Sequence, residues 1–131
     1  MLRLFTNTLI VMLVSLLIIS ANVRKRQQTQ YQEGLAGERA GSFMKALTGY
    51  ESAIRMYLPF SPTVERSAER IWYMGETAEK NHDAEQALIA YRSLRSAFYA
   101  VRWIKQPGKT WISRCDSKIA ALVALRKKEN R

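Results

Sequence analysis

A stretch of 20 consecutive residues without a charge, from Leu4 to Val23, constrains this chain more than any other feature. An α-helix rises 1.5 Å per residue, so a helix of this length would cross a hydrocarbon layer about 30 Å thick. In a chain of 131 residues, such a stretch leaves room for only one small folded domain. The sequence therefore predicts either a membrane-spanning helix or a secretory signal sequence at the N-terminus.

The residues near the end of this stretch favour the spanning helix. Signal peptidase sites have small residues just before the cleaved bond, whereas the best candidate here, Ile19-Ser20-Ala21, begins with a bulky residue. We expect an uncleaved anchor with a basic flank over residues 1–26, followed by a helical domain over residues 27–131.

The basic residues on the two sides of the apolar stretch bear on its orientation. Arg24-Lys25-Arg26 follows the stretch and Arg3 precedes it, and Lys and Arg prefer the cytoplasmic side of a membrane. The larger group favours a cytoplasmic domain on a protein that crosses a bacterial-type inner membrane once. Short positive N-terminal tails often stay inside, however, so the opposite orientation remains open.

The rest of the chain predicts helices and no strand, because its apolar residues recur at spacings of three and four. Gly and Pro residues mark the breaks between segments. We expect the spanning helix to continue to about residue 40, followed by helices near 42–58, 62–80, 83–105 and 110–128. The predicted fold class is all-α.

Three local signals predict helix ends. Ser61 before Pro62 suits an N-cap followed by proline at the first helical position. Asp83, with Gln86 three residues later, resembles a capping box, and Asn81 suits a left-handed residue that ends the preceding helix.

Two segments of the domain repeat one another at an offset of 41 residues. The first is MKALTGYESAIRMY at residues 44–57, and the second is EQALIAYRSLRSAF at residues 85–98. In each, a small residue is followed four positions later by an aromatic residue, a spacing that places both on one helical face. The matched pairs are Ala46 with Ala87, Leu47 with Leu88, Tyr50 with Tyr91, Ser52 with Ser93, and Tyr57 with Phe98.

The repeated pattern resembles the second helix of a tetratricopeptide repeat. Before the second copy, Met74, Gly75 and Ala78 match the large, small and medium packing residues of the family's first helix, and Gly34 holds the small position before the first copy. The resemblance covers about residues 30–105 and implies stacked helix-turn-helix pairs, although the offset exceeds the family's usual length of about 34 residues. A simple antiparallel bundle would show similar spacings and is the alternative.

Two helix pairs are fewer than the three that such a stack normally needs, so we expect the last helix to act as a cap. Its apolar stripe consists of Trp111, Ile112, Cys115, Ile119, Leu122 and Val123. Because Cys115 is the single cysteine, the chain has no internal disulfide, and we expect its thiol to be buried.

The sequence offers little chemistry that would support catalysis. Its one histidine, His82, lies in a predicted turn without metal-ligand residues at suitable spacing. Gly108-Lys109-Thr110 resembles the end of a phosphate-binding loop, but Trp103 stands where the motif requires a glycine. We expect no enzymatic activity, no cofactor, no metal and no small-molecule substrate.

Two surfaces are candidates for partner binding. Tetratricopeptide proteins bind peptides in a groove lined by their first helices, and the resemblance places Tyr31, Leu35, Glu38, Glu69, Trp72, Glu76 and Glu79 there. The formal charge of +10 is concentrated in the C-terminal third, where we expect a basic surface. Its members are Arg92, Arg95, Arg102, Lys118, Arg126, Lys127 and Lys128.

These features predict a membrane-anchored scaffold for protein–protein interaction, an accessory or assembly subunit that binds a partner segment in its groove. The expected partners are other protein subunits, membrane proteins above all, and membrane lipid. The alternative is a purely structural subunit, whose spanning helix packs within a membrane complex while the basic domain braces it against an acidic partner or lipid headgroups. Nucleic acid is not an expected partner, because the anchor holds the domain at the bilayer.

Overall fold

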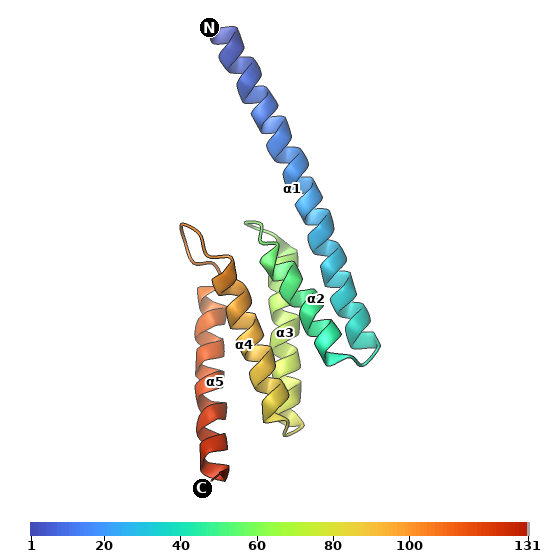
Figure 1. Cartoon of the computed structure of the whole chain (residues 1–131), viewed down its shortest axis with the longest axis vertical. Helices are drawn as coiled ribbons and strands as arrows, with labels where there is room; N and C mark the ends of the chain where they lie inside the picture. The colour runs from blue at the N-terminus through green and yellow to red at the C-terminus, as the bar shows by residue number, and fades with distance from the viewer. Residues whose placement is uncertain (131) are drawn as a thin grey trace.

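The computed structural model of the protein describes residues 1–130. In that range the chain forms five α-helices and no strand. Figure 1 shows them in chain order, with α1 extending well beyond the other four. The all-α prediction is therefore confirmed. The helices are α1 (Leu2–Arg39), α2 (Phe43–Arg55), α3 (Pro62–Lys80), α4 (Ala84–Ala100) and α5 (Lys109–Glu129).

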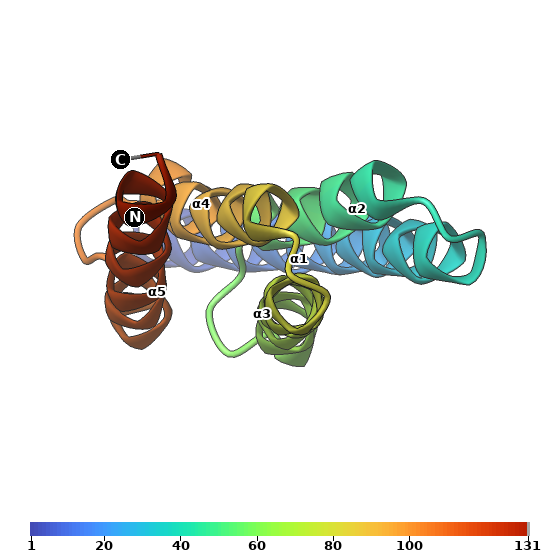
Figure 2. The ribbon, with the colours of Figure 1, turned by 90° about the horizontal axis from the view of Figure 1, so that it is seen from below.

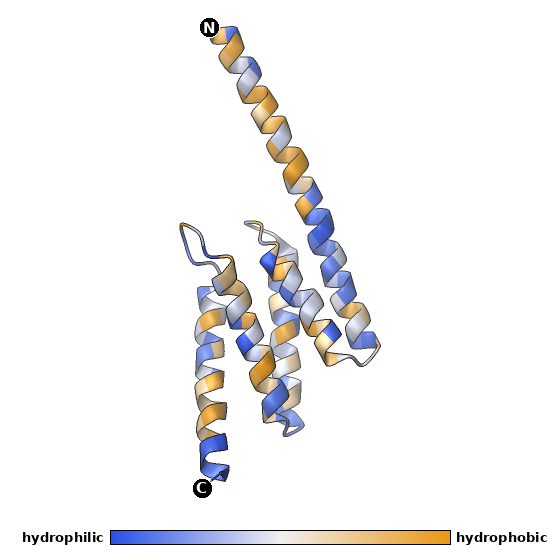
Figure 3. Ribbon diagram, in the orientation of Figure 1, coloured by the Kyte–Doolittle hydropathy of each residue, from blue (hydrophilic) through white to orange (hydrophobic). Residues whose placement is uncertain are grey.

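Helix α1 joins an apolar half to a half that packs against the domain. Its most apolar 18 residues have a mean hydropathy of 2.3, and none of them is buried. Figure 3 shows this half projecting away from the other helices. The helix is long and apolar enough to cross a membrane, a property that a signal sequence at this position would share.

The C-terminal half of α1 and the four shorter helices pack mainly as neighbours in the chain. Helix α1 contacts α2, α3 contacts α4, and α5 lies against α4. Seen from below, α2 and α4 lie on one side of the domain and α3 lies on the other (Figure 2). The largest fully buried side chains between them are Tyr50, Tyr91 and Phe98.

The two helix pairs bury a tyrosine against a glycine in the same way. A Cβ atom added at Gly34 would lie 2.6 Å from ring carbons of Tyr50, and one added at Gly75 would lie 2.6 Å from Tyr91. Glycine is used here because it lets the two helices approach closely. Since both the glycines and the tyrosines are 41 residues apart, the repeat in the sequence is also a repeat in the packing.

An aromatic ring on the first helix of each pair covers the buried tyrosine. Tyr31 of α1 packs on Tyr50 with ring centroids 5.5 Å apart and planes at 51°. Trp72 of α3 packs on Tyr91 at 4.9 Å and 53°. Tilted aromatic contacts of this kind stabilise a core by about 0.5–1.5 kcal/mol beyond the area that they bury. The two pairs are therefore built on one plan.

Helix α5 presents the expected apolar stripe to α4 and α3. Most of the stripe is covered, as a capping helix requires. Trp111, Ile112, Cys115 and Leu122 are buried, Ile119 is partly buried against the core, and Val123 is exposed at the edge.

The helix expected near 83–105 is too long, because α4 ends at Ala100. Gln106 donates a hydrogen bond from Nε2 to the carbonyl of Phe98 at 2.8 Å, which closes a loop after the helix. Pro107-Gly108 then prevents a helical continuation, since proline lacks the N–H donor and the glycine has a φ of +67°. Residues 101–108 are therefore a loop.

The turn between α3 and α4 differs from the prediction by one residue. The carboxylate of Asp83 accepts from the backbone N–H of Gln86 at 2.9 Å, as the capping signal indicates. The left-handed residue, however, is His82 with a φ of +58°, and Asn81 has a φ of −87°. The reason is that the N–H of Asp83 reaches back to the carbonyl of Ala78, which requires one further residue in the turn.

The start of α3 is placed as predicted, but the role of Ser61 is different. Pro62 is the first helical residue, and Ser61 precedes it without capping the helix through its side chain. The Ser61 hydroxyl instead donates to Oε1 of Gln27 at 2.5 Å, across to α1. Helix α2 ends at Arg55, short of the expected residue 58.

Replacing Gly75 by Ala should destabilise the protein, although Ala favours helices by about 1 kcal/mol over Gly. The added methyl group would meet the ring of Tyr91, which Trp72 and Glu79 hold in place, and overpacking of this kind costs about 1–3 kcal/mol. Chemical denaturation of the full chain in detergent, monitored by circular dichroism, should show a lower free energy of unfolding for Gly75→Ala than for the unaltered protein. Gly34→Ala should act in the same direction.

The matched control is Ser96→Ala, at an exposed position of α4, which should change the free energy of unfolding by less than about 0.5 kcal/mol. Unchanged or increased stability of both glycine variants would contradict the close approach of the two helices.

Candidate partner-binding surface

Trp72, expected in the groove, is half-buried where α3, α4 and α5 meet. Its ring centroid lies 4.9 Å from that of Tyr91 and 5.9 Å from that of Trp111. The guanidinium of Arg114 lies 4.1 Å from the Trp72 centroid and 4.5 Å from that of Trp111, as in cation–π contacts. Trp72 therefore helps to hold the capping helix against the second helix pair.

The expected groove and the expected basic surface meet at Glu79 and Lys118. The Lys118 ammonium lies 2.8 Å from Oε1 of Glu79, and the same oxygen accepts a hydrogen bond from the hydroxyl of Tyr91. Partial burial opposes ionisation of Glu79, but Lys118 and Tyr91 outweigh it and lower its pKa below the ordinary value of 4.5. The ion pair between Glu79 and Lys118 therefore joins α3 to α5.

A similar polar contact joins the first helix pair to the second. Glu38 of α1 forms an ion pair with Arg70 of α3, in which the Nε of Arg70 lies 3.1 Å from the carboxylate. The buried Tyr50 hydroxyl lies beside this pair, and burial raises the pKa of Tyr50 to about 12. Glu38 and Glu79 are 41 residues apart, so the first helix of each pair offers one carboxylate to the helix two places further along the chain.

The remaining expected groove residues differ in how far a partner can reach them. Tyr31 and Leu35 are partly buried against the core, and Glu76 is half-buried on α3. Glu69 is exposed. The structure therefore uses most of the expected groove residues for contacts between its own helices.

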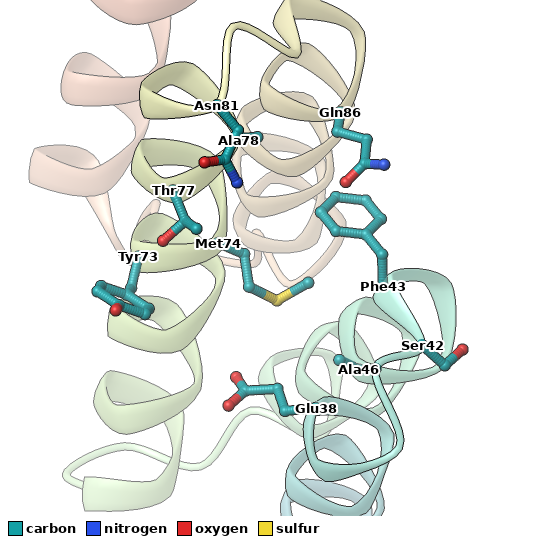
Figure 4. A pocket seen from close by; sticks show the side chains of 11 residues that line it. Glu38, Ser42, Phe43, Ala46, Tyr73, Met74, Thr77, Ala78, Asn81 and Gln86 are labelled. Carbon is teal, nitrogen blue, oxygen red and sulfur yellow. The ribbon is translucent and has the colours of Figure 1, made fainter.

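An open pocket of about 280 Å³ lies at the far end of the domain, beside the α1–α2 and α3–α4 turns. In Figure 4 the thioether of Met74 and the ring of Phe43 project into the space between α2 and α3, and the carboxylate of Glu38 lies at one side. Tyr73, which is 58% exposed, stands at the outer edge. The lining residues are Glu38, Gly41, Ser42, Phe43, Ala46, Tyr73, Met74, Thr77, Ala78, Asn81 and Gln86.

Only Glu38 of this pocket was among the groove residues expected from the sequence. Tyr73 and Phe43 were missed, because a groove assignment based on repeat positions selects every third or fourth residue of the first helices. No signal for the pocket was present in the sequence: Ala46 of α2 and Ala78 of α3 both line it with small side chains, but their sequence positions do not show that the two helices meet there.

The expected basic residues are divided among separate places. Arg92, Arg126 and Lys127 line a hollow of about 500 Å³ between α4 and α5, close to the exposed Lys128. These four residues form a basic patch near the C-terminal end of α5, and we call it the distal basic patch.

The other expected basic residues lie elsewhere. Arg95 forms an ion pair with Asp116 at 2.9 Å, and Lys118 is paired with Glu79 as described above. Arg102 follows α4 in the loop at the opposite end of the domain from the distal basic patch.

The described part of the chain offers no group of His, Cys, Asp and Glu side chains able to hold a metal ion. Cys115 is fully buried, as expected, and burial raises the pKa of its thiol to about 12. A thiol with so high a pKa is a poor nucleophile near neutral pH. His82 is exposed in its turn.

Replacing Glu79 by Gln should remove a pH-dependent part of the stability. A carboxyl group with a lowered folded pKa contributes stability that is present above its unfolded pKa, near 4.5, and is lost as the pH falls through the folded pKa. Because Glu79 and Lys118 are both partly exposed, we expect a loss of about 1 kcal/mol at neutral pH and little loss in strong acid.

Urea denaturation of the full chain at neutral pH and in strong acid measures the loss of stability in Glu79→Gln. Glu69→Gln, on the exposed face of α3, is the control. A loss that is equal at both pH values, or equal for the two variants, would show that the contact with Lys118 is not its source.

No protein-family model, curated protein or solved structure matches this chain. The features that bear on its function are a long apolar helix, two helix pairs with the same packing, an open pocket and the distal basic patch.

Proposed function

We propose that this protein is a non-enzymatic, membrane-anchored interaction scaffold, whose tetratricopeptide-like domain holds a segment of a partner protein at the bilayer. In this proposal α1 crosses a bacterial-type inner membrane once and the domain faces the cytoplasm. The exposed apolar half of α1 and the basic run Arg24-Lys25-Arg26 that follows it support this placement.

The pocket beside the α1–α2 and α3–α4 turns is the observation that carries the proposal. Its volume of about 280 Å³ falls just below the ~300–1,000 Å³ typical of small-molecule sites. Phe43 and Met74 give it an apolar wall, and Thr77, Asn81 and Gln86 provide hydrogen-bonding groups at its rim. This combination suits an apolar side chain of a partner segment, with the segment's backbone held by the polar rim.

The tether determines which partners the domain meets. A domain attached to a bilayer is concentrated near other membrane proteins, so a modest affinity in the pocket is sufficient for binding. With only two helix pairs and a cap, the domain presents a small surface. It therefore fits an accessory or assembly subunit of a larger membrane complex.

A purely structural subunit is the second candidate, and the surface of α1 supports it. The apolar half of α1 has no buried residue, so its whole circumference is available to pack among other membrane helices. The distal basic patch would then brace the domain against an acidic partner surface.

Replacing Tyr73 by Ala together with Thr77 by Glu should abolish partner capture in the first candidate. The changes remove an exposed aromatic edge and place a charge in the rim of the pocket, and neither residue is buried in the core. The measurement is mass spectrometry of proteins that co-purify with the intact protein from membranes in mild detergent. We expect the main partner to fall at least tenfold, roughly 1.4 kcal/mol.

Two controls separate the candidates. Tyr99→Ala removes a tyrosine on α4 that is 49% exposed and should leave the co-purified proteins unchanged. Replacing residues 4–23 by an unrelated apolar helix should also leave them unchanged. Retention of the partner by the pocket variant, with loss on exchange of the helix, would instead establish the structural subunit.

A further inference from the structure

The end of the domain nearest the apolar half of α1 exposes three large apolar side chains at the tips of two loops. Trp103 and Ile104, between α4 and α5, are 87% and 82% exposed. Phe60, between α2 and α3, is 100% exposed, with a positive φ of 62° that is rare for a residue with a side chain. Single exposed apolar residues are common, but a cluster of this size marks an interaction site.

The two loops are neighbours and have a defined shape. Together they line an open hollow of about 990 Å³. Gln106 fixes the second loop by donating hydrogen bonds to the carbonyls of Phe98 and Pro107 at 2.8 and 2.9 Å. The mostly apolar walls come from Tyr57 and Pro59 in the first loop and from Val101, Trp103, Ile104 and Pro107 in the second.

The loops lie at the level where the apolar part of α1 ends. Gln27, the first residue after the basic run, donates to the carbonyl of Met56 at 3.0 Å and accepts from Ser61, which ties the first loop to that level. Figure 1 shows both loops at the end of the domain that faces the apolar half of α1. Seen from below, the N-terminus projects onto α5 beside the second loop, so α1 leans toward it (Figure 2).

The same end of the domain is rich in basic residues, and its two nearest carboxylates, Glu51 and Glu65, are bound by Arg55 and by the indole N–H of Trp111. The segments 24–32, 52–64 and 98–110 contain no Asp or Glu. Arg55 is paired with Glu51 at 2.7 Å, and the other basic residues of these three segments form no ion pair in the described part of the chain. Aromatic residues at headgroup level, together with Lys and Arg, are typical of contacts with an anionic membrane surface. The basic residues are Arg24, Lys25, Arg26, Arg55, Arg102, Lys105 and Lys109.

We propose that the α2–α3 and α4–α5 loops form a second membrane contact, in which Phe60, Trp103 and Ile104 enter the interfacial layer of an anionic bilayer. This inference rests on the proposed function, because the bilayer is the one that α1 crosses. The basic residues bind the headgroups around the inserted side chains. With two contacts, the domain has a fixed tilt, and the pocket in Figure 4 lies at the end of the domain opposite the two loops.

Trp103 itself reports whether the contact forms. The other two tryptophans, Trp72 and Trp111, are packed within the domain, so the difference in emission between the unaltered protein and Trp103→Phe isolates Trp103. The full chain is reconstituted into phosphatidylglycerol-containing vesicles, with or without lipids brominated on the acyl chain. We expect brominated lipid to remove about half of the Trp103 emission and acrylamide in the water to quench it weakly.

The control is Leu125→Trp in the Trp103→Phe background, which places an exposed tryptophan on α5 near the opposite end of the domain. Its emission should respond to acrylamide and not to brominated lipid. Vesicles of phosphatidylcholine alone should quench Trp103 less, and equal quenching would overturn the role of the basic residues. Trp103 emission that behaves like that of the control would overturn the contact.

Extraction of the same vesicles with alkaline carbonate tests the span separately. Release of the protein would contradict the spanning helix and with it the proposed function. Retention of the protein, combined with an unquenched Trp103, would contradict the loop contact alone.

Discussion

One buried glutamine connects the apolar half of α1 to the rest of the protein. Gln27 is 1% exposed, and its Nε2 donates to the carbonyls of Ala53 and Met56 at 3.1 and 3.0 Å, while its Oε1 accepts from Ser61. The bonds reach the end of α2 and the residue before α3. Because a buried polar group without partners costs about 1–3 kcal/mol, they fix the register of α1 against both helices.

The position of Gln27 gives these bonds their importance. It directly follows Arg26, where a spanning helix would leave the bilayer, and α1 continues through it without a break. The domain is therefore joined to the apolar half of α1 by a continuous helix and not by a flexible linker. From this attachment follow the position of the two apolar loops beside the end of the apolar half of α1 and the position of the open pocket at the far end of the domain.

The sequence predicted the elements of the fold well and their mutual contacts poorly. Helical spacing indicates which residues share a face, so the helices and the burial of Tyr91 could be anticipated. It does not indicate which helix covers that face, and so it could not show that Trp72 and Lys118 meet across α3 and α5. Gln27 lies in the polar run QQTQYQ, where nothing local distinguishes it from its neighbours. The pocket likewise exists only once α2 and α3 are placed together.

The rigid attachment of the domain to α1 is tested most directly by a distance between them. Spin labels on cysteines introduced at the exposed positions Ala21 and Ser96 report this distance by pulsed electron paramagnetic resonance in reconstituted bilayers. The native Cys115 is buried and stays unlabelled. We expect one narrow distance distribution, retained in Gln32→Ala at an exposed site of α1 and broadened in Gln27→Ala. A broad distribution in the otherwise unaltered protein would contradict the rigid attachment.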